Sequence, residues 1–306
     1  MALEKLEHLR ENLRSYGSCL VAYSGGVDSV FLAYVAHEAL GQKALAVIAD
    51  SPSLPRHELE DALALGQRFG FPVRVVRTRE FQNADYLANP SNRCYFCKHE
   101  LFTELAPLAK AEGFGVIAYG ENASDLGDFR PGAQAASEFQ VRAPLKEAGL
   151  TKAEIRELSA RLGLPTAEKP QMACLSSRIP YGEEVTVKKL GMIESAESVL
   201  RDMGFYDVRV RHHELPGPTA LLFSGGNGLR QLGPSGPPVG GRTGKRHLAR
   251  IEVGPSEFSR FLVDGAAAKV AGALKRLGYS HVTLDLEGYR RGSSNEAGNL
   301  ASPQSV

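Results

Sequence analysis

The stretch Ser24-Gly25-Gly26-Val27-Asp28-Ser29 decides the fold of this chain. It follows the apolar run at residues 19–23 and precedes a run with helical periodicity at residues 27–40. We therefore predict a buried strand that ends in a glycine turn and leads directly into a helix. Glycines let the backbone approach a ligand closely, and a helix start presents N–H donors and a positive dipole end. The stretch predicts an anion site.

The polar side chains of the same stretch suit a polyphosphate ligand. Ser24 and Ser29 add hydroxyl groups, and Asp28 adds a carboxylate that can hold Mg²⁺ on a phosphate. The stretch is not a Walker A loop, because it lacks the Gly-x-x-x-x-Gly-Lys-Ser/Thr spacing. An ordinary glycine-rich turn between a strand and a helix is the alternative interpretation.

The stretch resembles the pyrophosphate loop (PP-loop), SGGxDS, of the N-type ATP pyrophosphatases. Those enzymes split ATP into AMP and pyrophosphate to adenylate a substrate. The resemblance implies that the chain binds ATP and Mg²⁺ through Ala22, Ser24, Gly25, Gly26, Asp28 and Ser29.

Composition restricts the class of protein. The chain has 306 residues, of which 43% are hydrophobic and 23% charged, enough for one large domain or two modest ones. A formal net charge of +1 gives no global reason to expect a nucleic-acid or membrane partner. The start of the chain reads as a charged amphipathic helix, so we expect a cytoplasmic protein. Four cysteines in a reducing compartment favour metal binding or catalysis over disulfides.

Strand and helix patterns alternate through the first half of the chain. Apolar runs predict strands, and 3.6-residue periodicity predicts the intervening helices. The predicted strands are 19–23, 44–49, 73–76 and 115–119, and the helices are 27–40, 56–69, 98–112 and 151–162. This alternation predicts an α/β fold, a doubly wound parallel sheet in residues 1–166. Ligands of such sheets bind beyond the carboxyl ends of the strands, where the glycine turn lies.

The pattern changes after about residue 180. A helix, two strands, a helix and a strand are predicted in turn at 187–203, 207–211, 248–253, 258–277 and 281–286. This order predicts a smaller α+β domain over residues 183–297, which a connector at 167–182 joins to the first domain. We expect residues 298–306 to form a disordered tail.

Residues 214–246 form an unusual insert. Of its 33 residues, 9 are Gly and 5 are Pro, a composition that does not support a packed core. Because it lies between two predicted strands, we expect a flexible extension at the tip of a hairpin.

Three cysteines suggest sulfur or metal chemistry. Cys94 and Cys97 form a Cys-x-x-Cys pair just before a predicted helix, and Cys174 lies in the connector. Three thiolates can hold three irons of a [4Fe–4S] cluster and leave the fourth iron open for a substrate or a sulfide. Alternatively, the cysteines are unrelated, or Cys174 is a lone nucleophile stabilised by Arg178. Cys19 reads as a small core residue.

Two further groups of polar residues are candidates. Asp125 or Asp128, which follow the predicted strand at 115–119, could contact Mg²⁺ or a ribose, and a polar surface turn is the alternative. Arg209 and Arg211 alternate in a predicted strand and share one face, an arrangement that suits a phosphate. On pattern alone, a solvated edge-strand face is the usual alternative.

Together these segments resemble the LarE-type sulfur transferases. The similarity runs from about residue 9 to residue 297, excluding the insert. The matched runs are Ala22-Tyr23-Ser24-Gly25-Gly26-Val27-Asp28-Ser29, Tyr119-Gly120-Glu121-Asn122, Ala173-Cys174-Leu175-Ser176-Ser177-Arg178-Ile179-Pro180-Tyr181-Gly182, Val208-Arg209-Val210-Arg211-His212-His213 and Leu284-Asp285-Leu286-Glu287-Gly288-Tyr289-Arg290-Arg291-Gly292-Ser293. The Cys174 run and the C-terminal run are the most specific.

The resemblance implies a two-step reaction. ATP adenylates a carboxylate of a pyridinium bis-carboxylic acid mononucleotide and releases pyrophosphate. Sulfur then displaces AMP and leaves a thiocarboxylate, in the synthesis of the nickel-pincer cofactor. The sulfur comes from a sacrificial cysteine matched by Cys174, or from a [4Fe–4S] cluster on three cysteines. Because this chain has Cys94 and Cys97 as well, it resembles the cluster branch.

The same resemblance assigns the remaining site residues. Gly120 and Asp125 join the ATP-binding set, and Glu197 matches an acidic residue of the sulfur-transfer step. Arg209 and Arg211 match residues that bind the substrate phosphate. The family also implies a homo-oligomer acting on a nucleotide-like small molecule.

Two other enzyme classes share the loop. A PP-loop tRNA thiolase also uses three cysteines, but it needs a basic surface for RNA, which a net charge of +1 does not favour. An amide-forming ligase of the NAD or GMP synthetase kind would not need the three cysteines.

Overall fold

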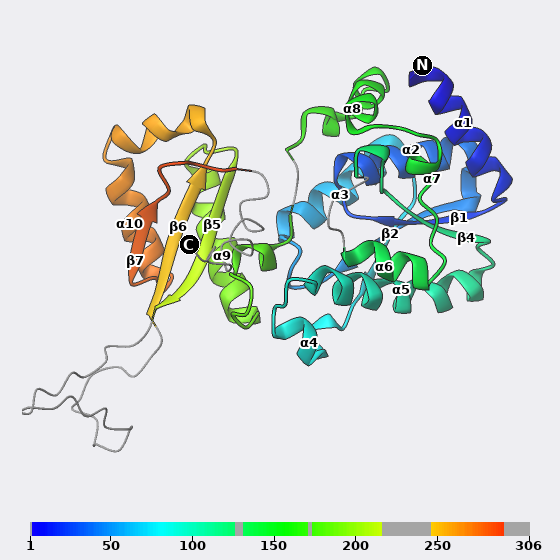
Figure 1. Cartoon of the computed structure of the whole chain (residues 1–306). Helices are drawn as coiled ribbons and strands as arrows, with labels where there is room; N and C mark the ends of the chain where they lie inside the picture. The colour runs from blue at the N-terminus through cyan, green and yellow to red at the C-terminus, as the bar shows by residue number, and fades with distance from the viewer. Residues whose placement is uncertain (1, 126–130, 171–172, 216–245, 291–306) are drawn as a thin grey trace, which may run out of the picture. The chain divides into compact units, whose positions relative to one another are not determined.

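The computed structural model describes residues 2–125, 131–170, 173–215 and 246–290. The chain divides into two compact units, Met1–Glu194 and Ser195–Val306. Figure 1 colours the elements of both units in chain order. Within the described residues, none of the helices combines the length and hydropathy needed to cross a bilayer.

A four-stranded parallel sheet organises the first unit (Figure 1). Its order is β3-β2-β1-β4, so the strand that precedes the glycine loop is central. The bounds are β1 Cys19–Tyr23, β2 Ala44–Asp50, β3 Val73–Arg77 and β4 Val116–Tyr119. All three strand pairs are parallel, which confirms the predicted α/β class. The four predicted strands lie within a residue of the observed ones.

Helices cover both faces of this sheet because β1 is apolar on both. Its residues Cys19, Val21 and Tyr23 belong to one hydrophobic cluster, whereas Leu20 and Ala22 belong to or pack on another. Alternate residues of a strand face opposite sides, so a continuous apolar strand needs cover on each side. The helices of this unit are α1 Ala2–Ser15, α2 Val27–Leu40, α3 Arg56–Phe69, α4 Ala84–Leu87, α5 Arg93–Glu112, α6 Pro131–Glu138, α7 Pro144–Glu147 and α8 Lys152–Arg161.

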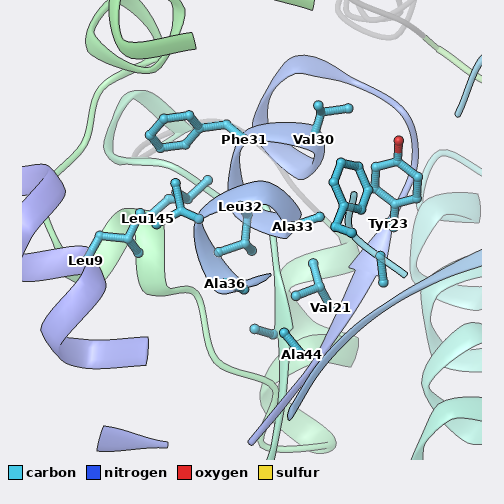
Figure 2. Close-up of a cluster of buried hydrophobic side chains, with 14 of the residues drawn as sticks. Leu9, Val21, Tyr23, Val30, Phe31, Leu32, Ala33, Ala36, Ala44 and Leu145 are labelled. Atoms are coloured by element: carbon cyan, nitrogen blue, oxygen red, sulfur yellow. The ribbon is translucent and has the colours of Figure 1, made fainter. Parts of the chain in front are cut away.

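Helix α2, which follows the glycine loop, is mostly buried. Figure 2 shows its apolar side chains packed with Leu9 of α1, Leu145 of α7 and Val21 of β1. Phe31 and Leu32 are fully buried, and each such side chain contributes roughly 1.5–3 kcal/mol of transfer free energy. This packing fixes the start of α2, and therefore the loop that leads into it.

One helix begins earlier than predicted. Helix α5 begins at Arg93, so Cys94 and Cys97 lie in its first turns rather than before a helix beginning at residue 98. The first residues of α5 are polar and aromatic and show no apolar periodicity. A prediction from periodicity therefore puts the start of the helix too late. The two cysteines are therefore held by helical geometry.

The second unit contains a three-stranded sheet of order β5-β6-β7. Its strands are β5 Val208–Leu215, β6 Arg246–Val253 and β7 His281–Leu284. Strands β5 and β6 are antiparallel, and β6 and β7 are parallel. Helix α9, Val187–Asp202, precedes β5 along the chain. The predicted helix at 187–203 and the three predicted strands occur in the expected order.

The single helix predicted at 258–277 is wrong. The structure has a 3-10 helix, η6 Pro255–Leu262, and a separate helix, α10 Ala266–Arg276. Between them Asp264 and Gly265 have φ values of 54° and 66°. A right-handed helix cannot continue through this left-handed backbone, so the two segments separate.

The insert and the tail were predicted from composition alone. Leu215 and Arg246 are paired at the ends of β5 and β6, as expected for a hairpin. Residues 216–245 of the insert, the predicted tail at 298–306 and Asp128 lie outside the described residues.

The glycine loop gives a stability prediction. Gly25 has a φ of +74°, and a Cβ there would lie 2.9 Å from Cβ of Ala62 on α3. Gly17 has a φ of +71° with nothing within 4 Å. We expect Gly25→Ala to lower the free energy of unfolding by about 2 kcal/mol and Gly17→Ala by about 1 kcal/mol, in chemical denaturation. Equal losses would mean that α3 does not restrict the loop.

The start of α8 gives a pH prediction. Thr151 and Glu154 form a capping box, and Lys5 of α1 lies 2.7 Å from the Glu154 carboxylate. Hydrogen bonds from Lys5 and the Thr151 backbone lower the pKa of Glu154 to about 2. Because the folded-state pKa lies below the unfolded value of about 4.3, the stabilisation is present above that value and disappears as the pH falls toward 2.

We therefore expect Glu154→Gln to lower the free energy of unfolding by roughly 0.5–1 kcal/mol at neutral pH and to have little effect near pH 2. Glu157→Gln on the same helix is the control, because its pair with Arg161 is exposed. A loss for Glu154→Gln that did not change between pH 7 and pH 2 would contradict this account.

Candidate active site

A cavity of about 200 Å³ lies at the carboxyl ends of β1 and β4. Tyr23 and Tyr119, the last residues of these two strands, both line it. The predicted ATP-binding residues that line it are Ala22, Ser24, Gly26, Asp28, Ser29 and Gly120. The cavity therefore occupies the place where ligands of parallel α/β sheets bind.

The glycine loop closes on itself through hydroxyl groups. The backbone N–H of Ser24 donates to Oγ of Ser29 at 3.1 Å, and that hydroxyl donates to the Gly26 carbonyl at 3.0 Å. Gly26 precedes α2 and caps it without a side-chain hydrogen bond. The first turn of α2 thus keeps the character of an anion site, with backbone donors and the positive end of the helix dipole.

Gly120 brings the end of β4 against this loop. A Cβ at this position would lie 3.1 Å from the backbone nitrogen of Ser29 and 3.2 Å from Cβ of Asp28. Any larger residue would push the strand and the loop apart. Asp125 accepts a hydrogen bond from the Asn122 backbone at 3.1 Å, and it is not among the residues that line the cavity.

Two lysines lie at the loop, and the sequence analysis did not identify them. Lys152 Nζ lies 2.5 Å from Oδ2 of Asp28. Lys169 Nζ lies 2.6 Å from Oε2 of Glu58 and 3.4 Å from the Gly25 carbonyl oxygen. Burial alone would raise the pKa of Glu58, but hydrogen bonds from His57 and Lys169 bring it below its ordinary value. The loop therefore has ammonium groups beside it, each held by a carboxylate.

The opposite wall of the cavity comes from α5 and β4. Lys98 of α5 lines the cavity, and its Nζ lies 4.5 Å from the centroid of the Tyr119 ring. Glu121 accepts hydrogen bonds from the Tyr119 hydroxyl and, at 3.0 Å, from Lys146. Burial favours a higher pKa for Glu121, and these two bonds lower it. The wall thus combines an aromatic ring with charged groups, which suits a nucleotide.

The three candidate cysteines all lie in the first unit and influence one another electrostatically. Cys94 and Cys97 lie in the first turns of α5, and Cys174 precedes a 3-10 helix, η5 Leu175–Arg178. Cys94 is exposed at the surface, yet desolvation of its sulfur by the surrounding atoms and the charge of Cys174 raise its pKa. Burial, the Glu80 carboxylate and Cys174 raise the pKa of Cys97. Cys19, by contrast, is buried in β1, where burial raises its pKa to about 12, as expected for a core residue.

The connector holds Cys174 through its backbone. Arg178 donates to the carbonyl oxygens of Ala173 and Cys174 at 2.7 and 3.0 Å. Ser176, two residues after Cys174, hydrogen-bonds the hydroxyls of Ser53 and Tyr86 at 2.7 and 2.9 Å. These buried contacts tie the segment to the sheet domain. Of the residues that the structure describes, those lining the cavity include no cysteine.

The three thiols match a [4Fe–4S] cluster in the kind and number of their donors. In the described part of the chain, however, no group of three His, Cys, Asp or Glu side chains is placed to hold a metal ion. Of the kinds of donor present, the sulfurs are the ones that iron–sulfur clusters use.

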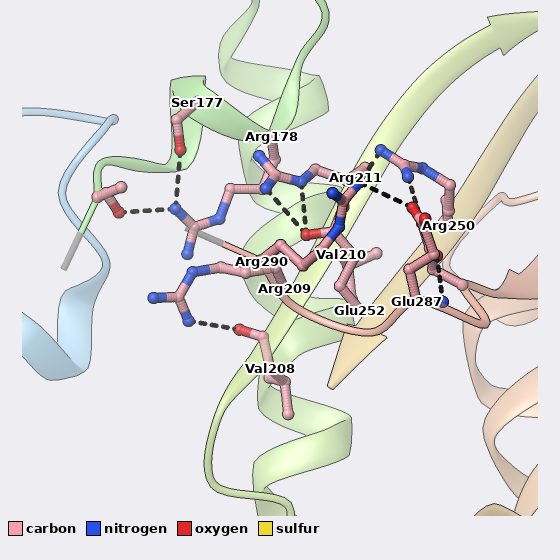
Figure 3. A network of polar contacts seen from close by, with 12 residues as sticks. Ser177, Arg178, Val208, Arg209, Val210, Arg211, Arg250, Glu252, Glu287 and Arg290 are labelled. Carbon is pink, nitrogen blue, oxygen red and sulfur yellow. Dashed lines mark hydrogen bonds and ion pairs between the residues drawn. The ribbon is translucent and has the colours of Figure 1, made fainter. Parts of the chain in front are cut away.

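The remaining predicted residues lie in the second unit. Figure 3 shows Arg211 against Glu252, with Nε and Nη2 at 3.0 and 2.9 Å from one carboxylate oxygen. Arg209 donates to the Val208 carbonyl at 2.7 Å. Both arginines are buried, unlike a solvated edge-strand face. Glu197 is fully buried and accepts hydrogen bonds from Arg201 at 2.9 Å and from the Val210 backbone at 3.1 Å.

Comparison with known proteins identifies the family. The chain is 31% identical, over 278 residues, to the pyridinium-3,5-bisthiocarboxylic acid mononucleotide synthase of Lactiplantibacillus plantarum. The match covers 90% of this chain and 88% of that protein. The chain belongs to the LarE-type family of PP-loop proteins. The predicted family is thereby confirmed.

Other known proteins are similar to all or part of this chain. An uncharacterized protein of Synechocystis sp. is 43% identical over 96% of this chain and 98% of its own length. The NAD synthase family model matches residues 3–89, which contain the PP-loop. A glutamine-hydrolyzing GMP synthase of Crocosphaera subtropica is 25% identical over 65% of this chain and 41% of its own length. This LarE-type protein is thus an ATP-utilising enzyme.

Lys98 gives a binding prediction. Replacing it with Met removes a positive charge from the cavity wall and keeps the aliphatic chain, so we expect ATP to bind about tenfold more weakly. Isothermal titration calorimetry measures the change. Lys110→Met, on the exposed last turn of α5, is the control and should bind ATP as the wild type does. Unchanged affinity in Lys98→Met would exclude this wall from the nucleotide site.

Proposed function

We propose that this LarE-type enzyme converts a carboxylate of a nucleotide-like small molecule to a thiocarboxylate, in the synthesis of a nickel-pincer nucleotide cofactor. ATP adenylates the carboxylate, pyrophosphate leaves, and sulfur displaces AMP. The observation that carries the proposal is that helix α5 bears both the Cys94–Cys97 pair and Lys98 of the nucleotide cavity. At about 1.5 Å of rise per residue, Cys97 and Lys98 are neighbours along the helix axis.

The first step requires a better leaving group on the carboxylate carbon. A carboxylate oxygen leaves poorly, and adenylation converts it to the oxygen of AMP. Backbone donors of the PP-loop bind the departing pyrophosphate, and Lys152 and Lys169 beside the loop balance its charge. Asp28 would hold Mg²⁺, which when bound neutralises polyphosphate charge.

The second step requires a sulfur nucleophile close to the acyl adenylate. Cys94, Cys97 and Cys174 would hold a [4Fe–4S] cluster, which when bound supplies an expendable sulfide. Support comes from the electrostatic effect of Cys174 on both other thiols. A sacrificial Cys174 is the other source of sulfur that the same residues allow. The site must exclude water, because an acyl adenylate hydrolyses.

The second unit would recognise the substrate. Arg209 and Arg211 share one face of β5, and we propose that they bind the substrate phosphate. Glu197 is assigned to the sulfur-transfer step, and the enzyme is expected to form a homo-oligomer. Because one carboxylate oxygen of Glu252 accepts from both Nε and Nη2 of Arg211, the guanidinium group has a defined orientation.

An amide-forming ligase of the NAD or GMP synthetase kind is the second candidate. The NAD synthase family match and the GMP synthase relatives favour a shared nucleotide chemistry. That reaction uses ammonia as its nucleophile and gives no role to three neighbouring thiols. Mass spectrometry of the product distinguishes a thiocarboxylate from an amide.

Cysteine variants test the proposal. We expect Cys174→Ala and Cys94→Ala to lose the thiocarboxylate product, because the sulfur site is broken, while most pyrophosphate release remains. Cys94→Ala should also lose iron, measured anaerobically with acid-labile sulfide. Cys19→Ser is the control, since Cys19 lies in the core of the sheet, and it should keep its iron. Loss of one sulfur from Cys174 per turnover in iron-free protein would instead establish the sacrificial route.

A further inference from the structure

Arg93 is a buried cation with neutral partners. It is the first residue of α5 and is only 4% exposed. Its Nη1 donates to Oδ1 of Asn89 and, at 3.1 Å, to the carbonyl oxygen of Ser176. The guanidinium carbon lies 5.9 Å from the centroid of the Tyr181 ring. Among the described residues, no carboxylate forms an ion pair with Arg93.

A buried charge without a counter-ion is unfavourable, and proteins normally pair such groups with an opposite charge or a ligand. Asn89 and the Ser176 carbonyl satisfy hydrogen bonds, but they do not neutralise the charge. Both of these bonds use Nη1, one of the three nitrogens of the guanidinium group. A nearby anion would therefore stabilise the buried charge of Arg93.

Two cysteines act electrostatically on Arg93. Burial lowers the pKa of Arg93, whereas Cys174 and then Cys94 raise it. Conversely, the charge of Arg93 and a hydrogen bond from its side chain lower the pKa of Cys94. Geometry places Arg93 near the same two residues, because it directly precedes Cys94 in α5 and donates to the carbonyl of Ser176, two residues after Cys174.

The start of α5 adds to the positive potential. No acidic residue occupies its first turn, so the positive end of the helix dipole is not neutralised there. Lys98, one turn further on, also lowers the pKa of Cys94. The negative group nearby is Glu80, which is 2% exposed, hydrogen-bonds Ser51 and acts on Cys97.

We propose that Arg93 is a positioning residue that holds an anionic sulfur species against Cys94 and Cys174. The anion is either a free hydrosulfide ion or the sulfide of an iron–sulfur cluster bound by the thiolates, and both present the same charge to the guanidinium. This inference rests on the proposed function and names the residue that balances the charge of its sulfur site. If Arg93 served only to hydrogen-bond Asn89 and Ser176, an uncharged donor at this position would do the same.

Three substitutions separate charge from hydrogen bonding. Arg93→Lys keeps the charge and a donor, Arg93→Gln keeps a donor without the charge, and Arg93→Met keeps neither. Circular dichroism and size exclusion check that each variant is folded. If one neutral variant does not fold, the other serves in its place.

The first arm uses iron-free protein and sodium hydrosulfide under argon. Because an anion that binds the folded state raises its stability, hydrosulfide should raise the Tm of the wild type and of Arg93→Lys. Arg93→Gln and Arg93→Met should show no shift. Sodium chloride at the same ionic strength is the control for general screening.

The second arm uses protein reconstituted with ferrous iron and sulfide. We expect Arg93→Gln to lose iron to a chelator at least tenfold faster than the wild type, and Arg93→Lys to lose it at close to the wild-type rate. The reduction potential of iron retained by Arg93→Gln should be more negative, since a nearby cation favours the reduced state. This potential is a readout that a purely structural role would not move.

The arms identify the source of the anion. A response to hydrosulfide alone supports Arg93 as the anion-holding residue and counts against the cluster in the proposed function. A response of the iron-loaded protein alone assigns the anion to the cluster. Neutral variants that match the wild type in both arms would overturn the inference, as would a wild type that responds in neither, even if thiocarboxylate is still produced.

Discussion

The close approach of backbone to backbone at the PP-loop is the constraint on which the site depends. Gly25 has a positive φ and contacts Ala62 of α3, and Gly120 brings β4 against Ser29 and Asp28. These contacts leave no room for side chains. Because α2 is buried in the core, the loop cannot relax away from its neighbours. Packing against α2, α3 and β4 thus fixes the conformation of the loop.

Charge around this loop is balanced internally. Lys152 pairs with Asp28, and Lys169 pairs with Glu58 beside the Gly25 carbonyl. In such partly buried pairs, each ammonium group has a carboxylate to balance its charge. A polyphosphate could exchange with the carboxylates for the same cations.

Helix α5 connects the two halves of the chemistry. Its first turns carry the thiols Cys94 and Cys97, its next residue Lys98 lines the nucleotide cavity, and its first residue is the buried Arg93. A rigid helix keeps these groups at constant spacing, which a loop would not do. The later predicted start of this helix would have left the cysteines on a flexible segment. The observed start gives them defined directions.

Much of the fold followed from local patterns in the sequence. The strands of the first unit, the PP-loop with Asp28 and Ser29, and the Cys-x-x-Cys pair are all properties of short stretches, because periodicity and turn chemistry act between near neighbours. The break at Asp264–Gly265 and the start of α5 were missed, since backbone conformation there does not follow the apolar pattern. Only the tertiary structure decided that Lys152 and Lys169 reach the loop, and that Arg93 is buried and hydrogen-bonded to Ser176 of the connector. These contacts join residues far apart along the chain, and packing of whole helices against the sheet, rather than any local preference, brings them together.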